Sequence, residues 1–339
     1  MSGPLADLAV VVPARLVATV GGARRVLAVG HENPDADALG AALAIGWLVE
    51  ALGGQATVAA SDGVPALYSF MPGVERVRTD PEPGVTYDLV VLCDCGEIGR
   101  AGAIIARNQA LFDGVPLVTI DHHVSNAGVG AAAWIDPGAA ATCEMVALLA
   151  ERLGVTLTTG DGAFASALAA GIVMDTATFA HPNTTSRTLR VGAALVEAGA
   201  PLSEISRRIY RSKPAAQLAL FGRVLARLES LADGLVVASA MELADLAATG
   251  AKSEHSEGII DLLAQSETAE VALLLKEKGA ETRLSIRTKP GGVDATELCG
   301  TWGGGGHARA AGASLPLPLA ESRAAVLPVA ERFAREVSR

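Results

Sequence analysis

Several features that define common protein classes are scarce or missing in this 339-residue chain. Aromatic residues make up only 4% of it, and its four cysteines are too few for a disulfide framework in a chain of this length. No uncharged stretch approaches the roughly 18 residues that a membrane-spanning helix needs. Because the N-terminal segment also lacks a basic leader, we expect a cytoplasmic protein with no signal peptide and no membrane contact.

The chain also lacks an excess of positive charge. Its formal net charge is -10, and residues 1–199 hold 20 acidic but only 10 basic side chains, whereas residues 200–339 hold 17 of each. Proteins that wrap long nucleic acids depend on many Lys and Arg contacts to phosphates. The balance therefore disfavours long duplex nucleic acid as a partner and is compatible with a small anionic substrate held by metals and a few arginines.

The hydrophobic pattern predicts an α/β protein with two domains. Short apolar runs at 24–30, 87–94 and 116–121 predict strands of a parallel sheet with helices on both faces, such as a helix at 38–52. A smaller α/β unit with a candidate substrate-binding role follows, with strands predicted at 234–240, 269–277 and 282–288. We place the domains at 1–200 and 221–339, joined by a linker at 201–220, with a cleft between the two lobes.

Acidic and imidazole side chains recur in four short segments at the ends of apolar runs. The segments are HENPDAD at 31–37, CDC at 93–95, DHH at 121–123 and VMDT at 173–176. Hard oxygen ligands with a few imidazoles suit divalent cations, and ligands of parallel sheets collect at the carboxyl ends of the strands. A single Asp could instead cap a helix or shape a turn, but four such segments together predict a two-metal hydrolase.

Two of the carboxylates lie close together in the first segment. Its proline opposes helix, so His31 and Asp35 are expected on an irregular loop and Asp37 at the start of the next helix. The carboxylates of Asp35 and Asp37 would then point in different directions and serve different metals. The remaining ligands would be Asp94, which could bridge both ions, with His122 and Asp175 completing the second site.

Taken in order, these segments resemble a known family. HENPDAD, LCDCGEIGR, DHH and GIVMDTATF are similar to the motifs of the DHH phosphoesterase superfamily, and GGGGHARAAG at 303–312 is similar to the signature of its associated substrate-binding domain. The motifs cover nearly the whole chain and indicate the nanoRNase/pAp-phosphatase branch. A DHH tripeptide alone would be a weak signal, whereas the ordered set is specific.

The resemblance implies a role for each of these side chains. One metal, usually manganese in this family, would be held by His31, Asp35 and Asp94, and the second by Asp37, Asp94, His122 and Asp175. Asp121 would orient an imidazole, a common way to select the metal-binding tautomer. His123 would face the substrate phosphate and bind it. The catalytic residues would be His123, Asp121 and Asp94.

The same resemblance implies that the glycine cluster at 303–306 binds an anion. Without Cβ atoms, backbone N–H groups can approach a phosphate closely, although the cluster alone could be a flexible loop. With the adjacent histidine and the family pattern, we expect an anion to be bound by Gly304, Gly305, Gly306 and His307. Arg287 resembles the arginine that grips a terminal phosphate in this family, while Arg309 and Arg100 are further candidates that could equally be surface charges.

The function that the resemblance implies is a manganese-dependent phosphoesterase for short nucleotides. It would hydrolyse short oligoribonucleotides and linear dinucleotides to nucleoside 5'-monophosphates and remove the 3'-phosphate from adenosine 3',5'-bisphosphate (pAp), with cyclic dinucleotides such as cyclic di-AMP as further candidates. The family also suggests a homodimer. Three alternatives stay open: a family II inorganic pyrophosphatase, which lacks the glycine motif; a RecJ-like single-strand exonuclease, which has a more basic groove; and a non-catalytic nucleotide sensor, which needs no complete ligand set.

Overall fold

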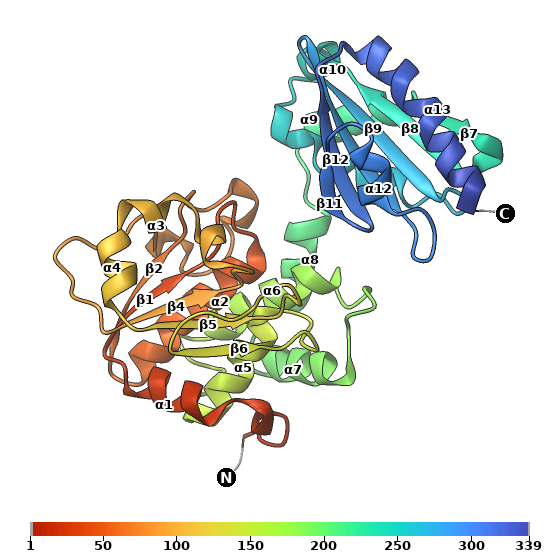
Figure 1. The fold of residues 1–339 in the computed structure, drawn as a ribbon. Helices are drawn as coiled ribbons and strands as arrows, with labels where there is room; N and C mark the ends of the chain where they lie inside the picture. Colours follow the sequence, from red (N-terminus) through yellow and green to blue (C-terminus); the bar gives the residue numbers. More distant parts are fainter. Residues whose placement is uncertain (1–2, 338–339) are drawn as a thin grey trace. The chain divides into compact units, whose positions relative to one another are not determined.

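The computed structural model describes residues 3–337, which form two compact units. The first unit ends at Ser212 and the second begins at Lys213; Figure 1 colours the first from red to green and the second from green to blue. The range predicted as a linker, 201–220, contains α8 (Leu202–Tyr210), which belongs to the first unit, and the beginning of α9 (Ala215–Leu225) in the second.

The first unit is built on a six-stranded sheet in the order β3-β2-β1-β4-β5-β6, with every pair parallel. Its central strands consist almost entirely of Val, Leu, Ile and Ala, as expected for strands that are covered on both faces. The predicted parallel sheet is therefore confirmed. The strands are β1 (Arg25–Val29), β2 (Gln55–Ala59), β3 (Val77–Arg78), β4 (Leu89–Cys93), β5 (Leu117–Asp121) and β6 (Ala132–Ile135).

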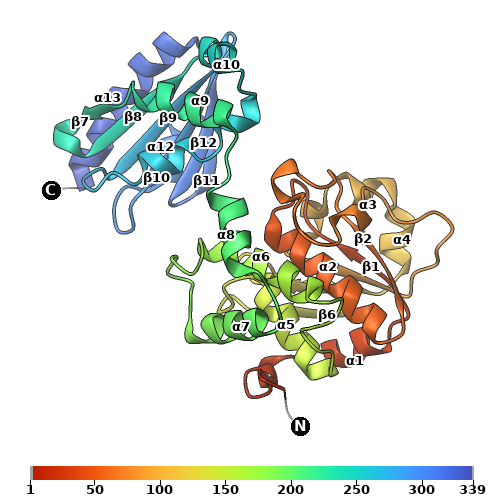
Figure 2. The ribbon, with the colours of Figure 1, turned by 180° about the vertical axis from the view of Figure 1, so that it is seen from behind.

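Helices cover both faces of this sheet, as predicted. Alternate strand residues enter two separate cores: Val91 and Ile120 belong to the larger core, and Val90 and Leu92 to the smaller one. The larger core lies under α1 (Ala14–Gly22), α2 (Ala36–Ala51), α5 (Thr142–Leu153), α6 (Ala163–Thr176) and α7 (Ser186–Glu197). The smaller core lies under α3 (Ala103–Arg107) and α4 (Gln109–Gly114), which Figures 1 and 2 show on the opposite side.

Close packing between α2 and α6 fixes the position of one site residue. A Cβ atom added to Gly171 of α6 would lie 2.4 Å from both Asp37 Oδ1 and Cys143 Sγ, so only glycine allows α6 to pass this near Asp37. Both helices are apolar on all sides, which suits helices that are buried rather than exposed. Among residues 3–337, no helix is long and apolar enough to cross a membrane.

The second unit is a six-stranded sheet in the order β11-β12-β10-β9-β8-β7, in which only β8 and β9 are parallel. One face packs on α12 (Ala295–Gly300) and α13 (Leu319–Val337), the other on α9, α10 (Leu243–Thr249) and α11 (Ile259–Leu263). Figure 1 shows α13 lying along the sheet. The strands are β7 (Glu229–Leu231), β8 (Val236–Met241), β9 (Val271–Lys278), β10 (Glu281–Thr288), β11 (Gly305–His307) and β12 (Ala310–Leu315).

Candidate metal centre

The carboxyl ends of three neighbouring strands bring the predicted ligands together. His31 follows β1, Asp94 follows β4 and His122 follows β5, and these strands are adjacent in the sheet. Asp35 is the N-cap of α2, where its Oδ1 accepts hydrogen bonds from the backbone N–H groups of Asp37 (2.9 Å) and Ala38 (3.0 Å). Its second oxygen, Oδ2, remains directed at the cluster.

His31, Asp35 and Asp94 form the first group of possible ligands, with one donor atom from each within 4.8 Å of the others. His31 Nε2 lies 3.9 Å from Asp35 Oδ2 and 3.6 Å from Asp94 Oδ2. The other ring nitrogen, Nδ1, lies 2.7 Å from the carbonyl oxygen of Glu32 and donates to it. This hydrogen bond selects the tautomer in which Nε2 is free to bind a cation.

Asp37, His122 and Asp175 form a second group of the same dimensions. His122 Nε2 lies 3.1 Å from Asp175 Oδ2, which α6 supplies from its last turn. Asp37 is fully buried, and its two oxygens accept hydrogen bonds from the backbone N–H groups of Thr142 (2.6 Å) and Cys143 (2.9 Å) at the start of α5. The positive end of that helix therefore stabilises a carboxylate that has left water.

Asp94 contacts both groups. Its Oδ2 faces His31, and its Oδ1 lies 3.5 Å from His122 Nε2 and accepts a hydrogen bond from Thr142 Oγ1 at 3.0 Å. The backbone of Asp94 is left-handed, with φ of 59°, a conformation that costs a non-glycine residue about 1–3 kcal/mol. This strained residue at the end of β4 places one carboxylate between two sets of ligands.

The third residue of the DHH segment has a different environment. His123 Nδ1 lies 2.8 Å from Asp121 Oδ1, and the ring is 42% exposed, so its other nitrogen is available to solvent or substrate. Asp121 itself is fully buried, and its Oδ2 accepts a hydrogen bond from Asn126 Nδ2 at 2.5 Å. Asn126 also donates to the carbonyl oxygen of Cys95 at 2.9 Å, which ties this segment to the end of β4.

Asn126 was not among the residues predicted for the site. In the sequence it is one polar residue in a short polar segment, which indicates a turn rather than a role in chemistry. The available signal was its position five residues after a buried aspartate, but the direction of its side chain depends on how the segment folds back on itself. The structure shows an Asn126–Asp121–His123 chain of hydrogen bonds.

The electrostatics of the cluster fit a divalent cation. Burial opposes the charged form of His31, but the carboxylates of Asp35 and Asp94 outweigh it and raise the pKa of His31 to about 10. Burial, with the nearby Asp94 carboxylate, raises the pKa of Asp175 to about 6. Burial followed by the charges of Asp175 and Asp94 raises the pKa of Asp37. Crowded, partly desolvated carboxylates of this kind attract a cation, and oxygen with imidazole is a suitable donor set for one.

The arginines predicted to bind substrate have distinct surroundings. Arg100 lies exposed in a short 3-10 helix, Ile98–Ala101, and its carbonyl oxygen accepts a hydrogen bond from the N–H group of Glu32 next to His31. Arg287 on β10 is ion-paired with Asp261 at 3.0 Å. Arg309 Nη1 donates to the backbone carbonyl oxygens of Lys289 (2.5 Å) and Val293 (3.2 Å), so this guanidinium group holds a loop in place.

Packing requires two of the predicted anion-binding glycines. A Cβ atom on Gly304 would lie 2.4 Å from Cys299 Sγ, and one on Gly306 would lie 2.4 Å from the carbonyl oxygen of Ala310. A Cβ atom on Gly305 would meet nothing within 4 Å. His307 is exposed at the end of β11. Packing therefore explains glycine at positions 304 and 306 but not at 305, and Gly305, Gly306 and His307 are all exposed.

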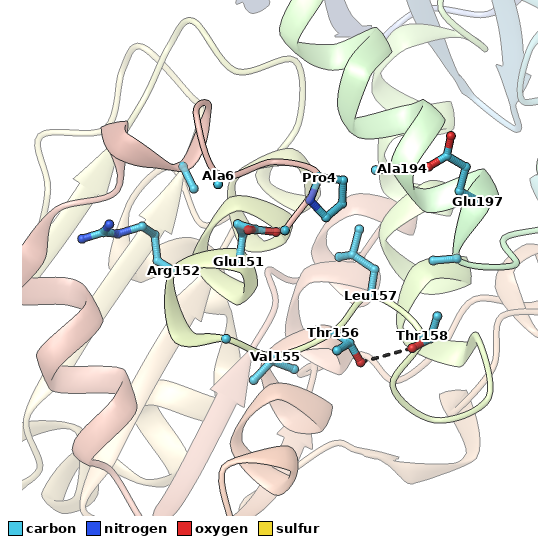
Figure 3. A pocket seen from close by; sticks show the side chains of 14 residues that line it. Pro4, Ala6, Glu151, Arg152, Val155, Thr156, Leu157, Thr158, Ala194 and Glu197 are labelled. Carbon is cyan, nitrogen blue, oxygen red and sulfur yellow. Dashed lines mark hydrogen bonds between the residues drawn. The ribbon is translucent and has the colours of Figure 1, made fainter. Parts of the chain in front are cut away.

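A hollow of about 670 Å³ lies elsewhere in the first unit. Figure 3 shows its lining, which includes the apolar side chains of Pro4 and Leu157 and the carboxylates of Glu151 and Glu197. None of the predicted site residues lines it, and it contains no cluster of metal-binding groups. The hollow is thus separate from the cluster of acidic and imidazole side chains at the carboxyl edge of the sheet.

A parallel sheet with an acid and imidazole cluster at its carboxyl edge defines a class of α/β proteins able to hold divalent cations there. Residues 25–172 match the DHH family, N-terminal domain, and residues 234–336 match the DHHA1 domain. This chain belongs to the DHH phosphoesterase superfamily.

Two relatives extend over most of the chain. It is 33% identical over 288 residues to the bifunctional oligoribonuclease and PAP phosphatase NrnA of Thermus thermophilus, covering 84% of this chain and 82% of that protein. The protein of the same name from Bacillus subtilis is 25% identical over 288 residues, covering 84% and 87%. The solved structure of an exopolyphosphatase-related protein from Bacteroides fragilis has a TM-score of 0.83, covers 96% of each chain and is 18% identical, a likeness that shows the fold alone.

Proposed function

We propose that this protein is a two-metal phosphoesterase for short nucleotides. It hydrolyses short oligoribonucleotides and linear dinucleotides to nucleoside 5'-monophosphates and removes the 3'-phosphate from pAp. The observation that carries the proposal is the position of Asp94 between two ligand groups, one with His31 and one with His122. The names of the Thermus thermophilus and Bacillus subtilis relatives contain both activities, which supports the choice of substrates.

We assign one ion to each ligand group, with Asp94 shared, and propose Mn²⁺ as the metal. When bound, the two ions would activate water for attack at phosphorus and offset the negative charge on the phosphoryl oxygens. The protein keeps their ligands in place: the N–H groups at the start of α5 hold Asp37, and Thr142 Oγ1 holds Asp94. The first ion would be held by His31, Asp35 and Asp94, and the second by Asp37, Asp94, His122 and Asp175.

His123 is the proposed proton donor to the leaving oxygen. Asp121 raises the pKa of His123 through their hydrogen bond, which favours the protonated ring. The same bond holds Nδ1 inward and leaves Nε2 for substrate. Asn126 fixes the second oxygen of Asp121 and so acts as a positioning residue for His123.

The second unit is the proposed substrate-binding domain. Gly305, His307 and Arg287 bind a terminal phosphate, because the first two are open to a ligand and Arg287 lies in the same cross-strand row as His307. We assign Gly304, Gly306 and Arg309 an indirect role, because their contacts shape the segment that presents Gly305. Arg100, near the His31 loop, is the proposed phosphate contact from the first unit.

A substrate panel tests the proposal. With Mn²⁺, we expect hydrolysis of pAp, pApA and a five-nucleotide RNA, and little hydrolysis of pyrophosphate; cyclic di-AMP is included as a further candidate. Product analysis by chromatography would identify the nucleoside monophosphates. Hydrolysis of pyrophosphate alone would contradict the proposal, and nucleotide binding without hydrolysis of any substrate would indicate a sensor. The predicted homodimer and cytoplasmic location stay predictions from the sequence, and analytical ultracentrifugation tests the first.

A further inference from the structure

Part of one face of the second unit's sheet carries basic side chains, of which Lys276 and Arg283 lie outside the site described above. On this face α9 and α11 pack against β8 and β9, with Val237, Met241, Ala272 and Leu274 in their core. Side chains alternate between the two faces of a sheet. The register of the strands therefore identifies which residues of the neighbouring strands lie on this same face. We call this part the open face; it consists of Arg283, Ser285 and Arg287 of β10, Ala310, Gly312 and Ser314 of β12, and Gly305 and His307 of β11.

Three cross-strand rows run over the open face and the adjoining Lys276 of β9; the two outer rows carry basic side chains, and the middle row carries small residues. One row pairs Lys276 with Arg283 and Arg283 with Ser314. The middle row consists of Ser285, Gly312 and Gly305, which together form a low floor. The last row consists of Arg287, Ala310 and His307, which contains the side chains already proposed to bind a terminal phosphate.

The charges at the first end form no ion pair with an acidic side chain within residues 3–337. Arg283 Nη1 donates to Ser314 Oγ at 3.2 Å, and within residues 3–337 no ion pair includes Arg283. Lys276 Nζ and the nearby Lys278 Nζ donate to hydroxyl oxygens, of Ser256 at 3.3 Å and Ser253 at 2.9 Å. Arg287 at the other end differs, because Asp261 neutralises it.

Burial and neighbouring cations both oppose the positive charge of Lys276. Burial lowers the pKa of this ammonium group, and the charges of Lys278 and Arg283 lower it further, while Glu257 opposes them. The one acid that faces Lys278 across the strands, Glu281, forms no ion pair with this cluster in the described part of the chain. Three neighbouring cations that form no ion pair within residues 3–337, in a chain of net charge -10, are suited to bind an external anion.

The position of the Arg283 guanidinium group indicates where that anion lies. A Cβ atom on Gly312 would lie 3.4 Å from Arg283 Nη2, so the guanidinium group extends across β12 over the floor of glycines. Four residues separate Arg283 from Arg287, which is about 13 Å along a strand. One phosphate group cannot contact residues at both ends of the floor, whereas a chain of nucleotides offers a phosphate at every step.

We propose that Lys276 and Arg283 form a second phosphate subsite, which binds the backbone of an oligonucleotide whose terminal phosphate lies at Arg287 and His307. The subsite rests on the proposed function and adds chain-length preference to it. pAp carries both phosphates on one nucleoside and does not reach this subsite. A longer oligonucleotide gains a contact there that pAp lacks.

The test compares substrates of different length on one variant. For Arg283→Ala we expect KM for a five-nucleotide RNA to rise about fivefold, and the dependence of its log(kcat/KM) on log[KCl] to lose about one unit of slope, as for removal of one phosphate contact. kcat/KM for pAp should stay within about twofold of the wild-type value. Lys276→Gln should add to the effect on the RNA. The matched control is Arg332→Ala, which removes an exposed arginine from α13 on the opposite face.

Each other outcome has a defined meaning. An equal loss on RNA and pAp, or no loss on either, would overturn the subsite, provided that thermal melting shows a folded variant. If the wild-type protein hydrolyses none of these substrates, the proposed function fails, and fluorescence anisotropy with labelled two- and five-nucleotide RNAs still tests the subsite. Weaker binding of only the longer RNA by Arg283→Ala would support it, and unchanged binding of both RNAs would overturn it.

Discussion

The first unit buries three carboxylates of its site, whereas the second unit leaves Arg283 and His307 exposed. Asp37, Asp94 and Asp121 are at most 2% exposed. Their partners are backbone N–H groups and a hydroxyl group at the start of α5, imidazoles that follow β1 and β5, and the amide group of Asn126. Arg283 and His307 lie on an open sheet surface whose floor is glycine. A buried charge is costly unless every partner is in position, while an exposed charge tolerates small displacements. Chemistry is therefore expected to depend on the first unit and substrate preference on the second.

The largest effect is expected from Asp94→Asn, which removes the charge shared by the two ligand groups. Hydrolysis of pAp and of RNA should both fall to background, because neither group keeps its full negative charge. Enzyme assays with both substrates, and Mn²⁺ titration by calorimetry, measure the loss. Asp113→Asn, an exposed aspartate on α4, is the control. Retention of one activity without the other would contradict a single shared site.

Asn126→Ala should weaken catalysis without weakening substrate binding. Asp121 loses the partner of its Oδ2, so we expect kcat to fall about 10- to 100-fold and the free energy of unfolding to fall by about 1–3 kcal/mol. KM for pAp should be nearly unchanged. The neighbouring, exposed Ser125→Ala variant should behave like wild type. A loss of stability with an unchanged kcat would mean that Asn126 only shapes the turn.

Two neighbouring glycines of the second unit should differ on substitution. Gly304→Ala should lower the free energy of unfolding by about 1–3 kcal/mol, because its Cβ atom would overlap Cys299 Sγ. Gly305→Ala has open space and should melt like wild type, while KM for pAp rises if the N–H group at this position approaches phosphate. Thermal melting and steady-state kinetics on both variants distinguish packing from binding. Equal melting temperatures would contradict the packing assignment.

The smallest effect on activity is expected from Asp245→Asn in α10 of the second unit, where the buried carboxylate is ion-paired with Arg223 and Arg227. A hydrogen bond from Arg227 lowers the pKa of Asp245, with smaller contributions from the N–H group of Glu242 and from Arg223. A lowered folded-state pKa stabilises the protein above the unfolded value of about 3.9, and this stabilisation is lost as pH falls towards the folded value. The free energy of unfolding of the wild-type protein should exceed that of the variant by about 1 kcal/mol at pH 7. Denaturant titrations should show the difference shrinking below about pH 4, with activity on pAp unchanged.

The two units also differ in how well local sequence predicted them. β1, β4 and β5 were recognisable because central parallel strands are continuous apolar runs. The candidate metal-binding residues follow these strands at their carboxyl ends, where parallel sheets commonly bind ligands. The contacts of Arg309 were not recognisable, because its guanidinium group reaches backbone carbonyl oxygens 16 and 20 residues away. Strand composition is a local property, whereas such contacts depend on how distant segments pack.

The amino-acid sequence by itself determined the α/β class of the fold, the residue types available to bind cations, and the order of motifs that marks the family. Only the tertiary structure decided which imidazole meets which carboxylate, that Asp121 holds His123, and that Asn126 holds Asp121. Likewise, only strand register placed Arg283 and Lys276 side by side. The physical reason is that residue type and period are properties of a short segment, whereas the direction of a side chain depends on atoms brought together from the whole domain.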